Sequence, residues 1–333
     1  MYLWEWLIER GKEQCTYEER VEQAKNQKRR AGQPELNAPA DVKESVAPRV
    51  FDNESLYTYN DTYIDVRTPH DEKRGLITLV ISGSIGLVVG WLVVILWFIV
   101  TQIYAGRQDL DFYIFTVALT PLVFLLALFL YIKHTYQFLK LESFTARRLI
   151  IRFNRITRKV YLLRPPHIGG IRIMDWDKTA IMLEKDMREA DGVGGFVWLI
   201  WDRGDGTCLD GTPTNHIEMV YIGKPARCAS ELLAFWEYVR RYMEDGPAAA
   251  PAPQKLICKF PWPWLSLRAA WRLDSSFFRD PALWVFVLAN TLLLPVILTH
   301  AFGHWVSLLL CYEPRFPRAI EEAGRAPMAT GTE

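Results

Sequence analysis

The chain has 333 residues, half of them hydrophobic, and a net charge of only +1 at pH 7. This length allows about two domains. The near-neutral balance argues against nucleic-acid binding, because the basic residues gather beside apolar segments rather than on a face of their own. The five cysteines have no regular spacing, so neither a disulfide framework nor a zinc site is predicted.

Residues 1–50 are predicted to form an N-terminal helix and a linker. Thr16 and Glu19 have the spacing of a capping box, and the helix that they begin is expected to run to Arg30. Residues 31–48 are rich in Ala, Pro and Asn, a composition typical of a linker.

Residues 51–75 are predicted to be a short β segment of their own. Its two strands alternate aromatic or apolar residues with polar ones, and Asn60 and Asp61 between them favour a turn.

Residues 76–132 carry the strongest pattern in the sequence. Leu76–Gly106 and Phe112–Ile132 contain no charged residue. A helix needs about 20 apolar residues to cross a bilayer core, so the pair predicts a transmembrane hairpin. Lysines and arginines gather before the first run and after the second. By the positive-inside rule, both ends of the hairpin are expected to face the cytoplasm.

Within the first run, Gly83, Gly86 and Gly90 lie close together. Small residues allow helices to approach closely, so these glycines are expected to mediate helix packing inside the hairpin, and a homo-oligomer through the same face stays open. The absence of ionisable residues from both runs argues against transport.

Residues 135–246 are predicted to form a cytoplasmic β domain. Short segments with an alternating pattern are separated by loops rich in Gly or Asp, and an amphipathic helix ends at Gly246. Roughly seven strands followed by a helix describe a small antiparallel barrel of the pleckstrin-homology (PH) type. The predicted core includes Val160, Ile173, Val197 and Trp236.

Two loops of this domain, 184–195 and 202–213, are long and acidic. Loops often carry recognition, and an acidic surface suits a basic protein partner. The alternative is that they are ordinary solvated turns. The candidate partner-binding residues are Glu184, Asp186, Glu189, Asp191, Asp202, Asp205 and Asp210.

The C-terminal part is predicted to return to the membrane. Residues 247–263 are a linker, 264–312 an interfacial and membrane-associated helical segment, and 313–333 a tail. The run 281–312 is too long for one span and too short for two, and Pro295 favours a bend. A single span, a re-entrant segment and a shallow hairpin therefore stay open.

Five arginines near the apolar segments are candidates for binding anionic lipid headgroups. They are Arg147, Arg148, Arg152, Arg268 and Arg272.

No pattern of residues predicts an enzyme, a cofactor or a metal site. His300 and His304 have the i, i+4 spacing of metal ligands on a helix, but they lack a suitable third ligand. Gly192–Gly195 and Asp202–Gly206 lack the further residues that phosphate and calcium loops require. Hairpin turns explain both segments.

Four motifs in order carry a resemblance to a known family. They are Asn60-Asp61-Thr-Tyr63, Arg152-Phe-Asn-Arg-Ile-Thr-Arg-Lys-Val-Tyr161, Asp175-Trp176-Asp-Lys178 and Pro314-Arg-Phe-Pro317. Together with the hairpin, they resemble an uncharacterised family of proteobacterial inner-membrane proteins, a domain of unknown function often encoded near type VI secretion effector genes. No catalytic residues are established for that family, so none is carried over. The resemblance implies immunity or accessory work for a secreted toxin.

The sequence thus predicts an α+β membrane protein of the bacterial inner membrane. It combines a transmembrane helical hairpin, a cytoplasmic antiparallel PH-like barrel with a C-terminal helix, and a C-terminal membrane-associated helical segment. The leading hypothesis is a non-enzymatic binding protein that gives immunity against a type VI secretion effector. The alternatives are a membrane-anchored adaptor or chaperone for effector loading and a lipid-sensing membrane module. Membrane lipid and a secreted toxin or secretion component are the expected partners.

Overall fold

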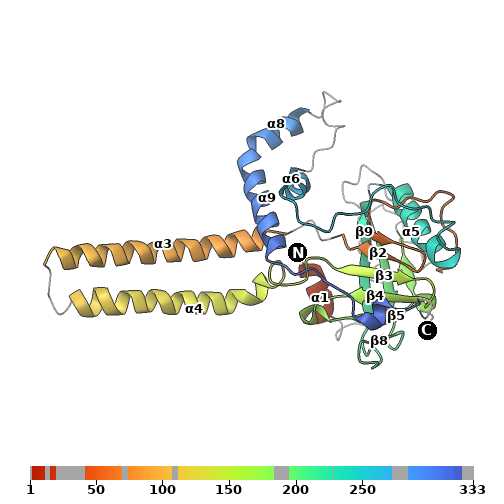
Figure 1. Ribbon diagram of the computed structural model, residues 1–333, viewed down its shortest axis with the longest axis horizontal. Coiled ribbons are helices and arrows are strands. Elements are labelled where there is room, and N and C mark those ends of the chain that lie inside the picture. Colours follow the sequence, from red (N-terminus) through yellow and green to blue (C-terminus); the bar gives the residue numbers. More distant parts are fainter. Residues whose placement is uncertain are drawn as a thin grey trace, which may run out of the picture. The chain divides into compact units, whose positions relative to one another are not determined.

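The structure is a computed structural model that describes residues 2–11, 16–19, 42–69, 74–106, 112–183, 195–226, 228–271 and 284–324. The chain divides into two units, each assembled from segments distant in sequence (Figure 1). The helical unit joins Lys73–Thr145 to Pro261–Cys311, and the mixed unit joins Tyr2–Glu72, Ala146–Phe260 and Tyr312–Glu333.

The helical unit contains both long apolar helices. The first is α3 (Leu76–Tyr104); the second begins as the π-helix η2 (Phe112–Leu119) and continues as α4 (Thr120–Leu139). Figure 1 shows α3 and α4 side by side. Both arms are long and apolar enough to cross a membrane. Their Leu, Val, Phe and Trp side chains are largely exposed along the arms, whereas a helix of a soluble protein buries an apolar face.

The glycines of α3 have open space where a side chain would stand, apart from the backbone of the helix itself and within the described residues. A Cβ added at Gly83, Gly86 or Gly90 would meet no other atom within 4 Å. The structure therefore gives these glycines no packing role inside the hairpin, and contact with a second copy of the chain stays a prediction.

A buried carboxylate closes the base of the hairpin. Glu142, which follows α4, accepts hydrogen bonds from the backbone N–H groups of Gly75 (3.1 Å) and Thr78 (2.9 Å) and from the Thr78 hydroxyl (3.1 Å). The first N–H groups of a helix lack partners within it, and the helix dipole favours a negative charge at that end. Glu142 therefore caps α3 from the opposite arm.

The described part of the helical unit also contains α6 (Pro263–Trp271), α8 (Trp284–Leu292) and α9 (Leu294–Leu309). The end of α9 packs on the hairpin base, where the Ser307 hydroxyl (2.7 Å) and the Cys311 thiol (3.1 Å) donate to the Glu142 carbonyl oxygen. The helix α6 is joined to α9 by a hydrogen bond between Ser266 and His304 Nδ1 (2.8 Å).

The mixed unit contains two antiparallel sheets. The larger has the order β1 (Leu56–Tyr59), β2 (Tyr63–Arg67), β3 (Ile150–Asn154), β4 (Lys159–Leu163), β5 (Arg172–Asp175) and β8 (Gly206–Cys208). The smaller has the order β6 (Ala180–Met182), β7 (Gly195–Trp201) and β9 (Glu218–Ala226). Among the described residues, the mixed unit also contains α1 (Leu3–Gly11), η3 (Pro166–Ile168), η4 (Trp176–Lys178), α5 (Ala229–Glu244) and α10 (Arg318–Glu321).

The antiparallel α+β architecture is confirmed, but the closed barrel is wrong. Among the described residues, the strands form two separate ladders. The short helix η4 diverts the chain between them after β5, and the Asp175 side chain caps it by accepting from the Asp177 N–H. Trp176, at the start of η4, is fully buried.

The strands β1 and β2 belong to the larger sheet rather than to a segment of their own. Tyr63 pairs with Asn154 and Arg67 pairs with Ile150 across β2 and β3. Residues before the hairpin therefore complete a sheet whose other strands follow it.

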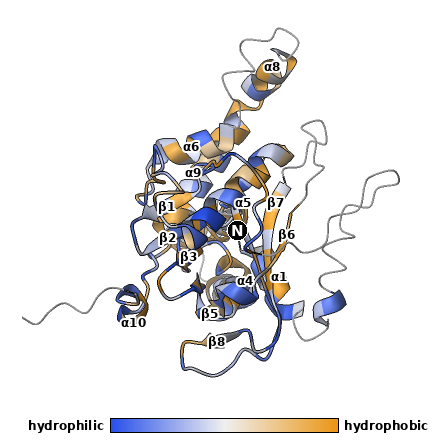
Figure 2. Cartoon of the chain, turned by 90° about the vertical axis from the view of Figure 1, so that its right-hand side faces the viewer, coloured by the Kyte–Doolittle hydropathy of each residue, from blue (hydrophilic) through white to orange (hydrophobic). Residues whose placement is uncertain are grey.

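The helix α5 packs over the core of the mixed unit. Trp236 is fully buried and stacks on Trp176 with ring centroids 5.7 Å apart, and Trp176 meets Phe153 edge to face at 5.9 Å. Val160 and Val197 are also buried there, as predicted. In Figure 2, β7 is drawn mainly in the orange of hydrophobic residues, consistent with its place in this core.

Ile173 was predicted to belong to the same core, and this prediction is wrong. Its neighbour Met174 is fully buried there instead, because successive side chains of a strand point to opposite faces of the sheet. Ile173 is partly buried and packs in a second cluster with Phe316 and Ile320.

A charged cluster attaches the segment before β1 to α5. Glu237 is fully buried and accepts hydrogen bonds from Arg240, Arg241, the Ser45 hydroxyl and the Val46 N–H. Burial alone raises the pKa of a carboxyl group, but here these hydrogen bonds outweigh it and lower the pKa of Glu237 to about 2.

The N-terminal capping box is confirmed. The Thr16 N–H donates to the Glu19 carboxylate (2.8 Å) and the Glu19 N–H donates to the Thr16 hydroxyl (3.2 Å). The predicted continuation to Arg30 lies outside the described residues. The helix α1 was not predicted; next to it Tyr2 is fully buried and its hydroxyl donates to the Ala146 carbonyl (2.5 Å).

Replacing Trp236 by alanine is expected to destabilise the mixed unit by roughly 3–5 kcal/mol, because it leaves a cavity beside Trp176. The measurement is unfolding of the purified full chain in detergent, followed by near-ultraviolet circular dichroism. Leu209→Ala is the matched control, since Leu209 is half exposed, and should unfold like the wild type. Identical unfolding of Trp236→Ala and Leu209→Ala would contradict the packing of α5 on the sheets.

Candidate functional site

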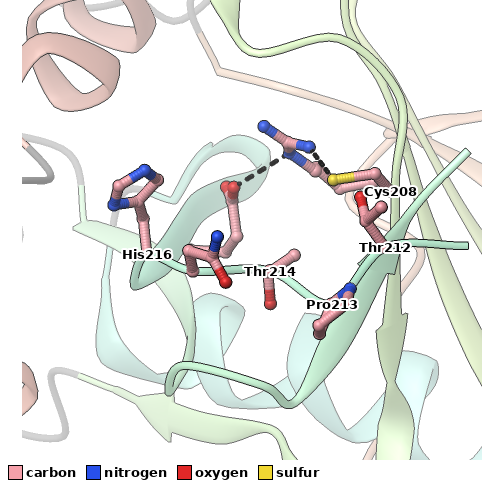
Figure 3. Close-up of a pocket in the computed structure, with 8 residues that line it drawn as sticks. Cys208, Thr212, Pro213, Thr214 and His216 are labelled. Carbon is pink, nitrogen blue, oxygen red and sulfur yellow. Dashed lines mark hydrogen bonds and ion pairs between the residues drawn. The ribbon is translucent and has the colours of Figure 1, made fainter. Parts of the chain in front are cut away.

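A half-open cavity of about 140 Å³ lies in the mixed unit, where β5, β8 and the start of β9 meet (Figure 3). The loop between β8 and β9 forms much of its wall. The polar groups that line it include Arg172, Cys208, Thr212, Thr214, His216 and Glu218.

Two arginines share one carboxylate beside this cavity. Glu218 is buried, and its oxygens lie 2.8 Å from Arg164 Nη1 and 3.3 Å from Arg172 Nε. Arg164 also donates to the Met219 carbonyl (3.0 Å), and the Arg172 guanidinium contacts the Cys208 sulfur. The dashed lines in Figure 3 mark the contacts of Arg172 with Glu218 and with Cys208. The position of its guanidinium is thus set from two sides.

The cavity offers polar groups for binding rather than a paired nucleophile and base. Cys208 and His216 lie at opposite ends of the group in Figure 3, and the sulfur contacts Arg172 instead of the imidazole. Asn215 and His216 line the cavity, and neither side chain has a hydrogen bond within the described part of the chain, so both are available to a ligand.

The acidic loop 202–213 borders this cavity, because it contains Cys208 and Thr212. Three of the candidate partner-binding residues lie here and are described: Asp202, Asp205 and Asp210. The other four, Glu184, Asp186, Glu189 and Asp191, fall outside the described residues.

The three described aspartates stabilise their own turns. Asp205 pairs with Lys178 (3.2 Å) and accepts from the Asp202 N–H (3.0 Å). Asp210 accepts from the Thr212 hydroxyl (2.7 Å) and N–H (3.0 Å), and these hydrogen bonds lower the pKa of Asp210. Asp202 and Asp210 nevertheless remain exposed, so their charges face water at the rim of the loop.

Arg152, a candidate for lipid binding, lies inside the mixed unit. Its side chain is 3% exposed and makes two hydrogen bonds to Asp65 (2.7 and 3.0 Å) and an ion pair with Glu321 (3.3 Å). The guanidinium carbon lies 3.6 Å from the Tyr63 ring centroid and 4.0 Å from that of Phe316. This burial corrects the prediction that Arg152 binds a lipid headgroup. The places that a headgroup would need are occupied by Asp65, Glu321, Tyr63 and Phe316.

The other arginines that were predicted to bind lipid headgroups lie in different environments. Arg147 and Arg148 are mostly buried and pair with Glu313 (3.1 and 3.6 Å). Arg268 is exposed on α6. Arg272 falls outside the described residues.

After α9 the chain returns to the larger sheet as a C-terminal strap (residues 312–324). Phe316 and Ile320 pack against Ile150 and Tyr161, and the Asn154 amide donates to the Ala323 carbonyl (2.8 Å). The strap therefore covers the face of the sheet opposite to α5.

The motifs of the family resemblance meet in space. Tyr63, Arg152 and Phe316 come from the first, second and fourth motifs and form the stack around the Arg152 guanidinium. The second and third are joined by Arg158, which pairs with Asp177 and with Glu244 of α5 (2.8 Å). Hydrogen bonds from these carboxylates raise the pKa of Arg158. These motif residues hold the sheet, the strap and α5 together.

Sequence reasoning missed Glu142, Arg164 and Glu218. Each is a charged residue beside an apolar segment, a position that in principle signals a buried partner. The partners are 54 residues apart for the Arg164–Glu218 pair and 64 for Glu142 and Thr78, so no local pattern identifies them.

Comparison with protein families matches residues 127–327 to DUF6708, a family of unknown function. The chain belongs to DUF6708. The matched region contains the cavity and the whole strap, whereas β1 and β2 lie outside it. In this DUF6708 protein, therefore, Asp65 and Tyr63, which surround Arg152, come from outside the matched region. No curated protein and no solved structure matches the chain.

Replacing Arg152 by methionine is expected to lower the free energy of unfolding by roughly 3–5 kcal/mol, because it leaves the Asp65 carboxylate buried without its partner. The measurement is chemical unfolding of the full chain in detergent. Arg203→Met is the matched control, because Arg203 is exposed. The double variant Asp65→Leu/Arg152→Met should regain part of the loss. Wild-type stability of Arg152→Met would contradict the structural role of this stack.

Proposed function

We propose that this DUF6708 protein is a non-enzymatic integral membrane protein that presents its mixed unit to a protein partner in the bacterial cytoplasm. The observation that carries the proposal is the apolar hairpin. Side chains such as Leu87, Trp97, Leu122 and Phe129 are more than half exposed. Exposing apolar surface to water costs about 25 cal/mol per Å², so lipid is the surrounding that fits these helices.

The orientation rests on charge. Lysines and arginines flank both ends of the hairpin, and such residues favour the cytoplasmic side. The hairpin as a whole begins after β2 and ends before β3, so with both of its ends in the cytoplasm the mixed unit would lie there too.

The proposed partner-binding surface is the loop 202–213 together with the adjoining cavity. Asp202 and Asp210 give the rim negative charge, while Arg172, Asn215 and His216 supply hydrogen-bond donors inside. A rigid sheet that positions a polar loop is a common arrangement for recognition. A basic segment of a partner protein fits the rim.

For the identity of the partner, we propose a toxin delivered by type VI secretion, with this protein as its immunity partner. The support is the resemblance carried by the four ordered motifs. An adaptor that holds an effector for loading is the alternative and would use the same surface. For the mixed unit we propose a PH-like relationship, supported by the order of β3 to β9 followed by α5.

A reporter enzyme that is active only in the periplasm tests the anchor. Fused after Arg74 or after Gly246, it is expected to be silent; inserted after Gly106, it is expected to be active. The physical reason is that each Lys or Arg placed at the centre of a span costs about 2.5–3.5 kcal/mol. Periplasmic activity of the Gly246 fusion would contradict the cytoplasmic placement.

Co-purification with proteins encoded beside the gene tests the partner. The variant in which Asp202, Asp205 and Asp210 become Asn is expected to recover less partner than the wild type at low salt, with a smaller difference at high salt, because salt screens charge–charge attraction. Asp61→Asn is the matched control, because Asp61 is exposed on another turn. Equal recovery by all three proteins at both salt concentrations would rule out the acidic rim.

Deletion of the gene distinguishes an immunity protein from an adaptor. Immunity predicts that deletion of the gene is toxic only when the neighbouring effector is active. An adaptor predicts that deletion abolishes secretion of the effector without self-intoxication. Failure of the wild type to bind any neighbouring protein would rule out both.

A further inference from the structure

The helix α9 is too short to be a third span. Its 16 residues extend about 24 Å, less than the roughly 30 Å of a bilayer core. The helix α8 adds nine residues, but Pro295 follows the break between them at Leu293, and proline lacks the N–H that would continue a regular helix.

The contacts of α9 with the hairpin lie at the hairpin base. Gly303 packs so closely on the first turn of α3 that an added Cβ would clash with Leu79. Further along, Ser307 and Cys311 donate to the Glu142 carbonyl. In Figure 1, α9 crosses the end of α3 instead of running beside it. A spanning helix would follow the hairpin along its length.

The helix α6 has one face on α9 and a different face outward. Ser266 is buried and bonded to His304. Trp262 and Trp264 stack on each other with centroids 4.5 Å apart, and both are exposed, as is Arg268. Tryptophan and arginine side by side are typical of the level of lipid headgroups.

We infer that α6 and α9 form an interfacial collar (Pro261–Trp271 and Leu294–Leu309) that lies in the plane of the membrane surface around the start of α3. The ligand of this collar is the phospholipid of one leaflet, with Arg268 at the phosphate level. The inference rests on the proposed membrane anchor. It is favoured over a span because α9 crosses the start of α3 and still exposes apolar side chains such as Val296 and Phe302.

This placement also explains the buried polar groups at the base. Glu142, Thr78 and His304 are buried where a span would begin. A collar over them keeps lipid from the carboxylate and water from the first turn of α3. In-plane helices bury their apolar face only about 5–10 Å into the interface, which is the depth that the collar should show.

Spin labels on single introduced cysteines test the depth of the collar. The full chain, with its own cysteines replaced by serine and its unfolding temperature checked against the wild type, is placed in vesicles of phosphatidylethanolamine and phosphatidylglycerol. The labelled variants are Val296→Cys and Phe302→Cys, with Leu87→Cys as the hydrocarbon reference and Leu209→Cys as the water reference. Accessibility to oxygen and to a water-soluble nickel chelate reports the depth of each label.

We expect Leu87→Cys deep in the hydrocarbon, Leu209→Cys in water, and Val296→Cys and Phe302→Cys at one shallow depth between them. Suppose that the Leu87→Cys label lies in hydrocarbon. If a label on α9 is then as deep as Leu87→Cys, or as accessible to water as Leu209→Cys, the collar is overturned and the anchor stays intact. A wet Leu87→Cys would overturn the anchor, and the collar with it.

Discussion

The cap that Glu142 places on α3 is the interaction on which the helical unit depends. An apolar helix has no side chain of its own to satisfy its first N–H groups, and in α3 the N-cap is Gly75. The carboxylate that bonds Gly75 and Thr78 comes from beyond α4, and the backbone of the same residue accepts from the end of α9. The buried Glu142 thus joins the start of α3, the end of α4 and the end of α9.

The Arg152 guanidinium has the corresponding role in the mixed unit. It joins β2 through Asp65, the strap through Glu321, and two aromatic rings from different segments. The strand β2, which precedes the hairpin, and the strap, which follows α9, therefore both contact β3 through Arg152. A chain interrupted by two long apolar helices needs such long-range contacts, because its sheet is assembled from segments that the hairpin separates.

Within the mixed unit, the cavity and the loop 202–213 offer polar groups to a ligand. Arg172 is fixed by Glu218 and Cys208, whereas the side chains of Asn215 and His216 line the cavity with no hydrogen bond to any described residue. A preorganised charged group beside adaptable donors suits recognition of a polar segment more than covalent chemistry. The proposed binding function rests on this exposed polar rim, whereas the buried motif residues hold the fold together.

The sequence by itself determined the elements whose signal is local. The uncharged runs of α3 and α4, the Thr16–Glu19 box and the amphipathic α5 depend on residues close together in the chain. Tertiary structure alone decided which strands share a sheet, that Met174 rather than Ile173 faces the core, and that Arg152 is buried instead of meeting lipid. The burial of Arg152 depends on Asp65 and Glu321, which lie 87 and 169 residues away in the sequence. The energy of a charge is set by the partner that the fold brings to it and not by its neighbours in sequence.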